Sequence, residues 1–105
     1  MFYISGFYKF KKITNIKKIR NILQNYFIIN SIKGTIIISS EGINGTISAE
    51  KMNLNLTLTQ IKKTFKIKNF DGLNLSKSKF QPFHRGKVKI KKEVVPMGLK
   101  ILKRN

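Results

Sequence analysis

The chain has 105 residues, a length that suits one compact domain, and it carries a formal net charge of +18 from 22 basic and 4 acidic residues. Hydrophobic residues make up 41% of it, enough for a core, so the charge alone does not make the chain disordered. The absence of cysteine excludes disulfides, thiolate–metal sites and cysteine catalysis, and with His84 as the single histidine we expect no metal or other cofactor. No apolar run approaches the ~18 residues of a membrane span, and Met1 to Phe10 lacks a secretory signal pattern. We therefore expect a soluble, cytoplasmic domain.

The excess of basic residues indicates a polyanionic partner. Lys, Ile and Asn together make up nearly half of the chain. An AT-rich genome over-supplies these amino acids, so nucleotide composition explains part of the lysine content. It does not explain why only 4 residues are acidic. Nucleic acid is the first partner we expect, and an anionic membrane surface is the second.

The first predicted elements are a strand and a helix. Tyr3 to Phe10 is short, aromatic and β-branched, which favours a strand. Apolar residues then recur at three- and four-residue spacing, which predicts an amphipathic helix from Ile16 to about Ile29 with Thr14 or Asn15 as its N-cap. The outer face of this helix is polar, and we expect it to be solvated; it holds Lys17, Lys18, Arg20, Asn21 and Gln24.

A β-hairpin is predicted next. Thr35 to Ser39 is β-branched up to its last residue, which is typical of a buried strand. Asn44-Gly45 is a strong turn dipeptide, because both residues tolerate positive φ. We expect Ile43 to Ala49 to pair back on the preceding strand.

Residues 52–67 fit two patterns. Alternation of Leu54, Leu56 and Leu58 indicates a strand, whereas a helical face runs through Leu54 and Leu58 to Ile61 and Phe65. The helical set spans more residues than the alternation does, so we predict a helix.

Two further strands complete the predicted fold. We expect one over Phe70 to Ser78, ended by Gln81-Pro82-Phe83, and a last one over Lys87 to Val95. The order is βαββαβ with one extra C-terminal strand. It predicts an α+β fold, a ferredoxin-like two-layer sandwich with both helices on one face of an antiparallel sheet.

The last predicted strand carries a stripe of lysines. Because side chains alternate along a strand, Lys87, Lys89 and Lys91 share one face, with ~6.6 Å between successive members. This spacing suits successive backbone phosphates of a nucleic acid. A solvated edge strand that lysines protect against aggregation explains the stripe equally well.

Two other segments are candidate functional sites. Phe83, His84 and Arg85 combine stacking groups with charge, as proteins that hold unpaired bases do, although a core phenylalanine beside a surface histidine is the simpler interpretation. The second segment offers backbone N–H groups, one carboxylate and one amide, although such a segment is usually an ordinary turn. Its candidate residues are Glu41, Gly42, Asn44 and Gly45.

No catalytic constellation is present in the sequence. It contains no Ser/His/Asp set, no paired carboxylates and no phosphate-binding loop of the Walker type. Acylphosphatases are small, basic ferredoxin-like enzymes with a glycine-rich loop after the first strand that ends in a catalytic arginine. Here the corresponding residues are Lys11 to Thr14, without glycine or arginine, so we exclude that activity.

Four segments together resemble one protein family. They are Phe7 to Phe10, Lys33 to Ile36, Glu41 to Thr46, and Gln81 to Arg85 followed by Lys87 to Val94. Their order and spacing resemble the N-terminal acylphosphatase-like domain of the rhodanese-containing, oxygen-dependent tRNA uridine hydroxylases. The resemblance implies a protein that converts the wobble uridine of certain tRNAs to 5-hydroxyuridine, and therefore a tRNA partner contacted near its anticodon.

The family's rhodanese domain, which carries a cysteine in its active-site loop, has no counterpart in these 105 residues. Residues 99–105 are a basic tail unlike the family's continuation, so we expect one domain over residues 1–98. The resemblance thus implies an RNA-binding domain that is inactive by itself: a fragment, a remnant or half of a split enzyme. The alternatives are a free-standing basic RNA-binding module and an interaction domain that docks a rhodanese subunit in trans. A basic sheet face would favour RNA, and an exposed apolar patch would favour docking.

Overall fold

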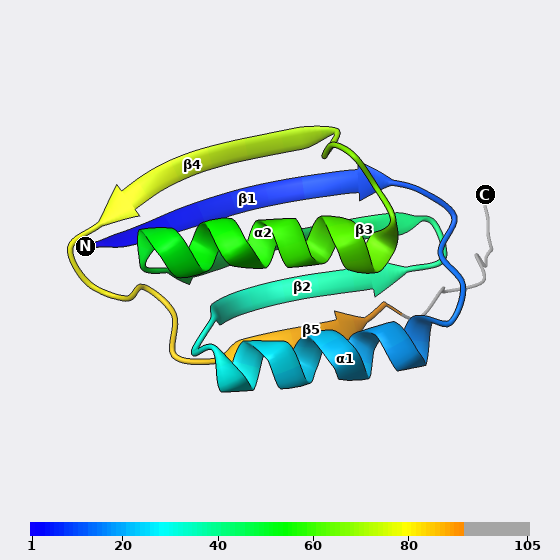
Figure 1. The fold of residues 1–105 in the computed structure, drawn as a ribbon, viewed down its shortest axis with the longest axis horizontal. Helices are drawn as coiled ribbons and strands as arrows, with labels where there is room; N and C mark the ends of the chain where they lie inside the picture. The colour runs from blue at the N-terminus through cyan, green and yellow to red at the C-terminus, as the bar shows by residue number, and fades with distance from the viewer. Residues whose placement is uncertain (92–105) are drawn as a thin grey trace, which may run out of the picture.

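A five-stranded sheet with both helices on one of its faces makes up residues 1–91, the part of the chain that this computed structural model describes (Figure 1). The α+β, ferredoxin-like fold class predicted from the sequence is confirmed. The elements, in chain order, are β1 (Phe2–Phe10), α1 (Ile16–Ile29), β2 (Lys33–Ser39), β3 (Gly42–Ala49), α2 (Lys51–Phe65), β4 (Gly72–Ser78) and β5 (Gly86–Ile90).

The strands lie in the order β4-β1-β3-β2-β5. All neighbours pair antiparallel except β2 and β5, which are parallel, so the prediction of an antiparallel sheet is wrong at this pair. The reason is the connection after β4, which crosses from one edge of the sheet to the other and brings β5 in alongside β2 with the same direction (Figure 1).

The core lies between the helices and one face of the sheet. Alternation sends one set of strand side chains, such as Ile36 and Ile38, under the helices, and both are fully buried. The other face carries no helix, and we call it the open face. Thr35 and Ile37 lie on it and are half-buried, so the predicted buried strand at Thr35 to Ser39 is present and is fully buried only on its helix-covered face.

The turn of the hairpin is not where the sequence predicts it. Ser39 pairs with Gly42, so the turn is Ser40-Glu41, and Asn44-Gly45 lies within β3. The Ser39 hydroxyl stabilises this turn by accepting a hydrogen bond from the Glu41 N–H at 3.2 Å. The predicted pairing of this strand with the preceding one is confirmed.

The prediction of a helix over residues 52–67 is confirmed, since α2 buries Leu54, Leu58, Ile61 and Phe65 in the core while Leu56 stays 56% exposed. Its C-terminus is capped from the segment that follows β1. The Nζ of Lys11 donates to the carbonyl oxygens of Phe65 at 2.7 Å and of Lys66 at 3.0 Å.

The N-cap of α1 is one of the two residues predicted for it, and the last strand is described over only part of its predicted length. Asn15 is the N-cap of α1, but it has a left-handed φ of 55° and its side chain makes no capping hydrogen bond. Strand β5 is assigned to Ile90, and the Lys91 N–H continues the pairing by donating to the Ile38 carbonyl at 2.8 Å. The rest of the strand predicted to Val95 lies outside the described residues.

Candidate nucleic-acid interface

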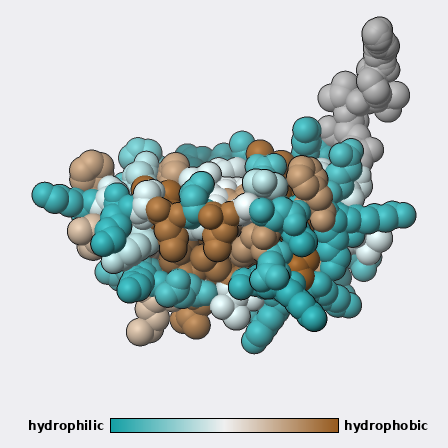
Figure 2. Space-filling model, turned by 90° about the horizontal axis from the view of Figure 1, so that it is seen from above, coloured by the Kyte–Doolittle hydropathy of each residue, from teal (hydrophilic) through white to brown (hydrophobic). Residues whose placement is uncertain are grey.

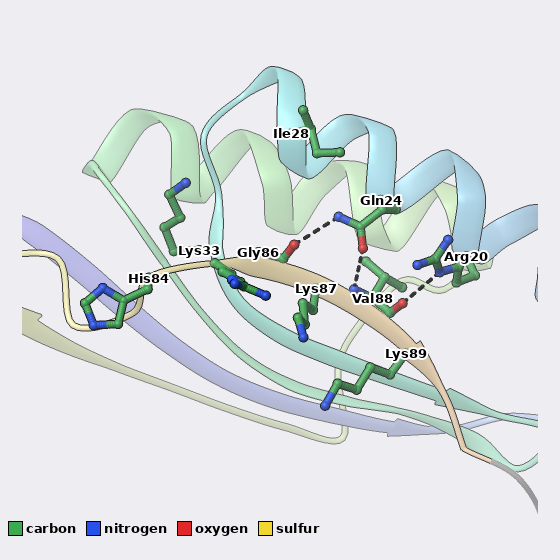
Figure 3. Close-up of a pocket in the computed structure, with 10 residues that line it drawn as sticks. Arg20, Gln24, Ile28, Lys33, His84, Gly86, Lys87, Val88 and Lys89 are labelled. Atoms are coloured by element: carbon green, nitrogen blue, oxygen red, sulfur yellow. Dashed lines mark hydrogen bonds between the residues drawn. The ribbon is translucent and has the colours of Figure 1, made fainter.

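Side chains of α1 satisfy the outer edge of β5. Gln24 donates from Nε2 to the Gly86 carbonyl and accepts from the Val88 N–H at Oε1, both at 2.9 Å. Arg20 donates from Nε to the Val88 carbonyl, also at 2.9 Å (Figure 3). The prediction that Arg20 and Gln24 belong to a merely solvated helix face is therefore wrong, because both close the edge of the sheet.

The lysines of β5 point away from the core. Val88 lies under α1 and is 1% exposed, whereas Lys87 and Lys89 alternate with it and are exposed. The register pairs Lys87 with Thr35 and Lys89 with Ile37, which places both lysines on the open face. Lys91 is exposed and continues the same alternation.

A groove of about 540 Å³ runs beside β5. Its polar lining is cationic or neutral, with no carboxylate among its residues, and Figure 3 shows these side chains distributed along β5 and the facing side of α1. We call this surface the β5 groove. It is lined by Arg20, Gln24, Ile28, Lys33, His84, Arg85, Gly86, Lys87, Val88 and Lys89.

The structure brings together four of the six residues predicted to bind RNA, namely His84, Arg85, Lys87 and Lys89. Phe83 is half-buried and does not line the groove, and Lys91 lines a separate hollow on the open face. The residues of the second predicted segment, Glu41 to Gly45, also lie in different elements. Glu41 lies in the hairpin turn, whereas Gly42, Asn44 and Gly45 belong to β3, where the Asn44 side chain is exposed on the open face.

Sequence reasoning missed Lys33 as a lining residue, because its place beside His84 depends on the pairing of β2 with β5. It also missed two exposed aromatic residues of the open face, Tyr8 and Phe10. Their signal was present in the sequence, since two aromatic residues at alternate positions of one strand must share a face.

The one salt bridge within residues 1–91 joins Lys9 to Asp71 at 3.2 Å, so the lysines of the β5 groove lack acidic partners there. The Phe10 N–H donates to Asp71 at 2.7 Å and lowers the pKa of this carboxyl below its ordinary value of 3.8. Desolvation opposes this effect by raising the pKa, and the hydrogen bond and charge of Lys9 make smaller contributions that lower it.

An apolar patch lies on the opposite side of the molecule from β5. Seen from above, on the β4 side, Figure 2 shows apolar residues gathered near the centre, with hydrophilic residues around them. On this edge strand Leu73 and Leu75 are 53% and 59% exposed. The sheet therefore has a cationic edge at β5 and an apolar edge at β4. Among the described residues, none of the helices has the length and apolar character to cross a membrane.

Solved structures with this fold include acylphosphatases. The acylphosphatase of Bacillus subtilis has a TM-score of 0.58 and 10% identity, over 84% of this chain and 98% of that one. The acylphosphatase of Coxiella burnetii has a TM-score of 0.57 and 9% identity, over 83% and 90%. Full-length HypF in its phosphate- and nucleotide-bound form has a TM-score of 0.60 and 14% identity, over 86% of this chain and 12% of that one. At these identities the likeness shows the fold alone.

Sequence comparison identifies a closer relative. The tRNA uridine(34) hydroxylase of Pelagibacter ubique (strain HTCC1062) is 58% identical over 105 residues, and the match covers all of this chain but only 35% of that protein. The family model described as the UPF0176 acylphosphatase-like domain matches residues 2–94. The resemblance found in the sequence is confirmed: this chain belongs to the UPF0176 acylphosphatase-like N-terminal domain family.

Proposed function

We propose that this chain is the tRNA-binding, N-terminal domain of a cytoplasmic tRNA uridine hydroxylase that converts wobble uridine to 5-hydroxyuridine. The observation that carries the proposal is the β5 groove, whose cations have no acidic partner within residues 1–91, on a domain whose relative is named for its action on tRNA. Positive charge without acidic partners attracts a polyanion and releases its counterions.

The arrangement at β5 weakens the alternative explanation of the lysine stripe. Lysines protect an edge strand whose peptide groups would otherwise pair with another chain. On β5 the hydrogen bonds of Arg20 and Gln24 already satisfy peptide groups of Gly86 and Val88. Protection of this edge therefore does not require the lysines, and contact with phosphate accounts for their number and common face.

The six residues predicted to bind RNA have two kinds of role in this proposal. Lys87, Lys89 and Lys91 each neutralise one phosphate of an unpaired segment near the anticodon, and Arg85 extends this row past the start of β5. His84 and Phe83 supply the stacking groups. The contacts position the tRNA, while the chemistry belongs to the rhodanese cysteine that the family resemblance implies and that this sequence lacks. We expect no hydroxylation by this chain alone.

Salt dependence tests the proposal. The probe is a tRNA anticodon stem-loop with uridine at the wobble position, and binding is measured by fluorescence anisotropy over a salt series. Each phosphate contact with a single strand contributes a slope of ~0.7 in log K against log salt, so changing Lys87, Lys89 and Lys91 together to Gln should flatten the slope by about 2. Changing Phe83 or His84 to Ala should weaken binding by a stacking contribution of ~1–3 kcal/mol and leave the slope nearly unchanged.

The matched control removes the same charge elsewhere. Lys17, Lys63 and Lys68 are exposed and lie outside the β5 groove, so a triple change to Gln lowers the net charge by the same amount. If both triple variants flatten the slope equally, general attraction to a basic protein explains binding and the assignment of the β5 groove is wrong.

The apolar edge at β4 favours a second candidate function, docking of a rhodanese domain in trans. Leu73 and Leu75 are more than half exposed there, and exposed apolar patches mark protein–protein contacts. Changing both leucines to Gln should then abolish capture of a purified rhodanese domain while leaving tRNA affinity unchanged. If the unmodified chain binds tRNA but captures no rhodanese domain, the result would instead indicate a free-standing RNA-binding module.

A further inference from the structure

Two aromatic side chains lie exposed on the open face of the sheet. The register pairs Tyr8 with Asn44 and Phe10 with Gly42 of β3, and alternation along β1 sends both rings away from the helices. Tyr8 is 45% exposed and Phe10 is 75% exposed. The ring centroids are 5.7 Å apart at an interplanar angle of 66°. The pair therefore adds nothing to the buried core, although it presents a large apolar surface to solvent.

The backbone around the pair is fixed. Gly72 lies opposite Tyr8 on β4, and a Cβ at this position would overlap the Tyr8 ring. The ring therefore packs directly against the backbone of Gly72, which only glycine permits. Asp71 holds the strand on both sides of Lys9, because its carboxylate accepts from the Phe10 N–H and its own N–H donates to the Tyr8 carbonyl at 2.9 Å. Binding to a surface that is already ordered loses little conformational entropy.

A hollow of about 210 Å³ lies beside the rings. It is smaller than the roughly 300–1,000 Å³ of pockets that enclose a whole ligand, so it suits a flat group that lies on the surface. Ile37, Asn44 and Lys91 line it together with the two rings. Glu41 also lines the hollow and is its one carboxylate, and Lys91 is exposed there and supplies a cation for a phosphate.

The polar groups of the hollow suit a nucleobase with its phosphate. Within the described residues the Asn44 side chain has no hydrogen-bond partner, and its amide offers one donor group and one acceptor in a plane. That pattern matches the donor and acceptor on the edge of an unpaired base. One row of the register runs from Lys89 through Ile37 and Asn44 to Tyr8, so the hollow and the β5 lysines share the same open face, three strand spacings or ~14 Å across.

We propose that Tyr8 and Phe10 are the stacking platform for an unpaired base of the bound RNA, with Asn44 contacting the edge of the base and Lys91 its phosphate. This inference rests on the proposed function and adds a second stacking site, on the open face, to the one at Phe83 and His84. A surface for another protein is the competing occupant. RNA is favoured because an exposed aromatic pair, a free amide and a lysine provide stacking, base-edge and phosphate contacts together.

A pair of matched oligonucleotides tests the platform. One probe is a heptamer of uridine, and the other has the same phosphates but an abasic central nucleotide. The unmodified chain should bind the intact heptamer roughly 5-fold or more tightly than the abasic one, the effect of stacking one base. Changing Tyr8 and Phe10 together to Leu should remove that preference without altering the salt slope, whereas Tyr8→Phe should retain it.

Phe80 provides the matched control, because it is 73% exposed and lies in the connection after β4. Phe80→Leu should leave the preference unchanged. If the unmodified chain binds the stem-loop with the expected salt slope, and the Tyr8 and Phe10 variant keeps its preference for the intact base, the platform is wrong and the proposed function stands. If changing Tyr8 and Phe10 to Leu leaves RNA binding intact but abolishes capture of a purified rhodanese domain, the platform is wrong and the open face binds protein. If the chain binds no RNA at all, the proposed function fails first.

Discussion

Gln24 and Val88 are joined by a hydrogen bond that completes the edge of the sheet. Oε1 of Gln24 accepts from the Val88 N–H at 2.9 Å, and its Nε2 donates to the Gly86 carbonyl at the same distance. The side-chain amide thereby takes the place that a peptide group of a sixth strand would occupy. Side chains of α1 therefore satisfy the edge of β5, and the lysines of β5 lie exposed on the open face.

Gln24→Ala should destabilise the domain by about 1–3 kcal/mol, because it leaves a part-buried donor and acceptor of β5 without partners. Thermal unfolding followed by circular dichroism measures the change, expected as a fall in Tm of several degrees for a domain of this size. Asn25→Ala is the control, since Asn25 is exposed on the same helix and should have little effect. Equal Tm values for the two variants would contradict this role of Gln24.

Most elements could be predicted because local patterns determine them. The spacing of apolar residues in α1 predicts where this helix begins and ends. In α2 the helical spacing of apolar residues spans more of the chain than the leucine alternation, and it predicts the helix. The hairpin turn could not be predicted in this way. Asn44-Gly45 remains in the strand because Phe7 of β1 packs across it, and a Cβ on Gly45 would lie 3.0 Å from the Phe7 ring and 2.7 Å from the Thr35 carbonyl oxygen. That constraint comes from residues far away in the sequence.

The candidate site also combines features that local patterns predict with features that depend on distant residues. Alternation on one strand predicts that Lys87 and Lys89 share a face, and they do. It cannot predict that Lys33 and Arg20 line the same groove, because their places depend on the parallel pairing of β5 with β2 and on the packing of α1. The shared face of Tyr8 and Phe10 could have been predicted from alternation on β1, but Tyr8 and Asn44 become neighbours only through the sheet register.

Lys11 should contribute to stability although its charge adds to a strongly positive chain. Lys11→Met keeps most of the aliphatic stem but removes two hydrogen bonds to carbonyl oxygens at the end of α2, so we expect a loss of about 1 kcal/mol or more. Lys12→Met removes the same charge from an exposed neighbour and should be close to neutral. Chemical denaturation of the two variants measures the difference. A Lys11 variant as stable as the Lys12 variant would show that the cap contributes nothing.

Asp71 should make stability depend on pH in the acid range. Its pKa is lowered in the folded state by the Phe10 N–H and by Lys9, so the folded protein binds fewer protons there than the unfolded chain. The stabilisation is therefore present above the ordinary value of 3.8 and is lost as the pH falls through the lowered pKa. The unmodified chain should have a higher Tm than Asp71→Asn near about pH 6, and this difference in Tm should shrink toward about pH 2. A difference that stays constant over this range would contradict the role of the charge.

Gly72→Ala should separate folding from RNA binding. A Cβ at Gly72 would overlap the Tyr8 ring, but that ring is 45% exposed and can turn away, so we expect the fold to persist while the ring leaves its position. The variant should keep the salt slope of the lysines and lose most of its preference for the intact over the abasic heptamer. Gly6→Ala is the control, because its Cβ would meet the flexible Asn74 side chain at 3.1 Å and not an aromatic ring. If Gly72→Ala retains the preference at unchanged stability, a fixed ring position is not what binds the base.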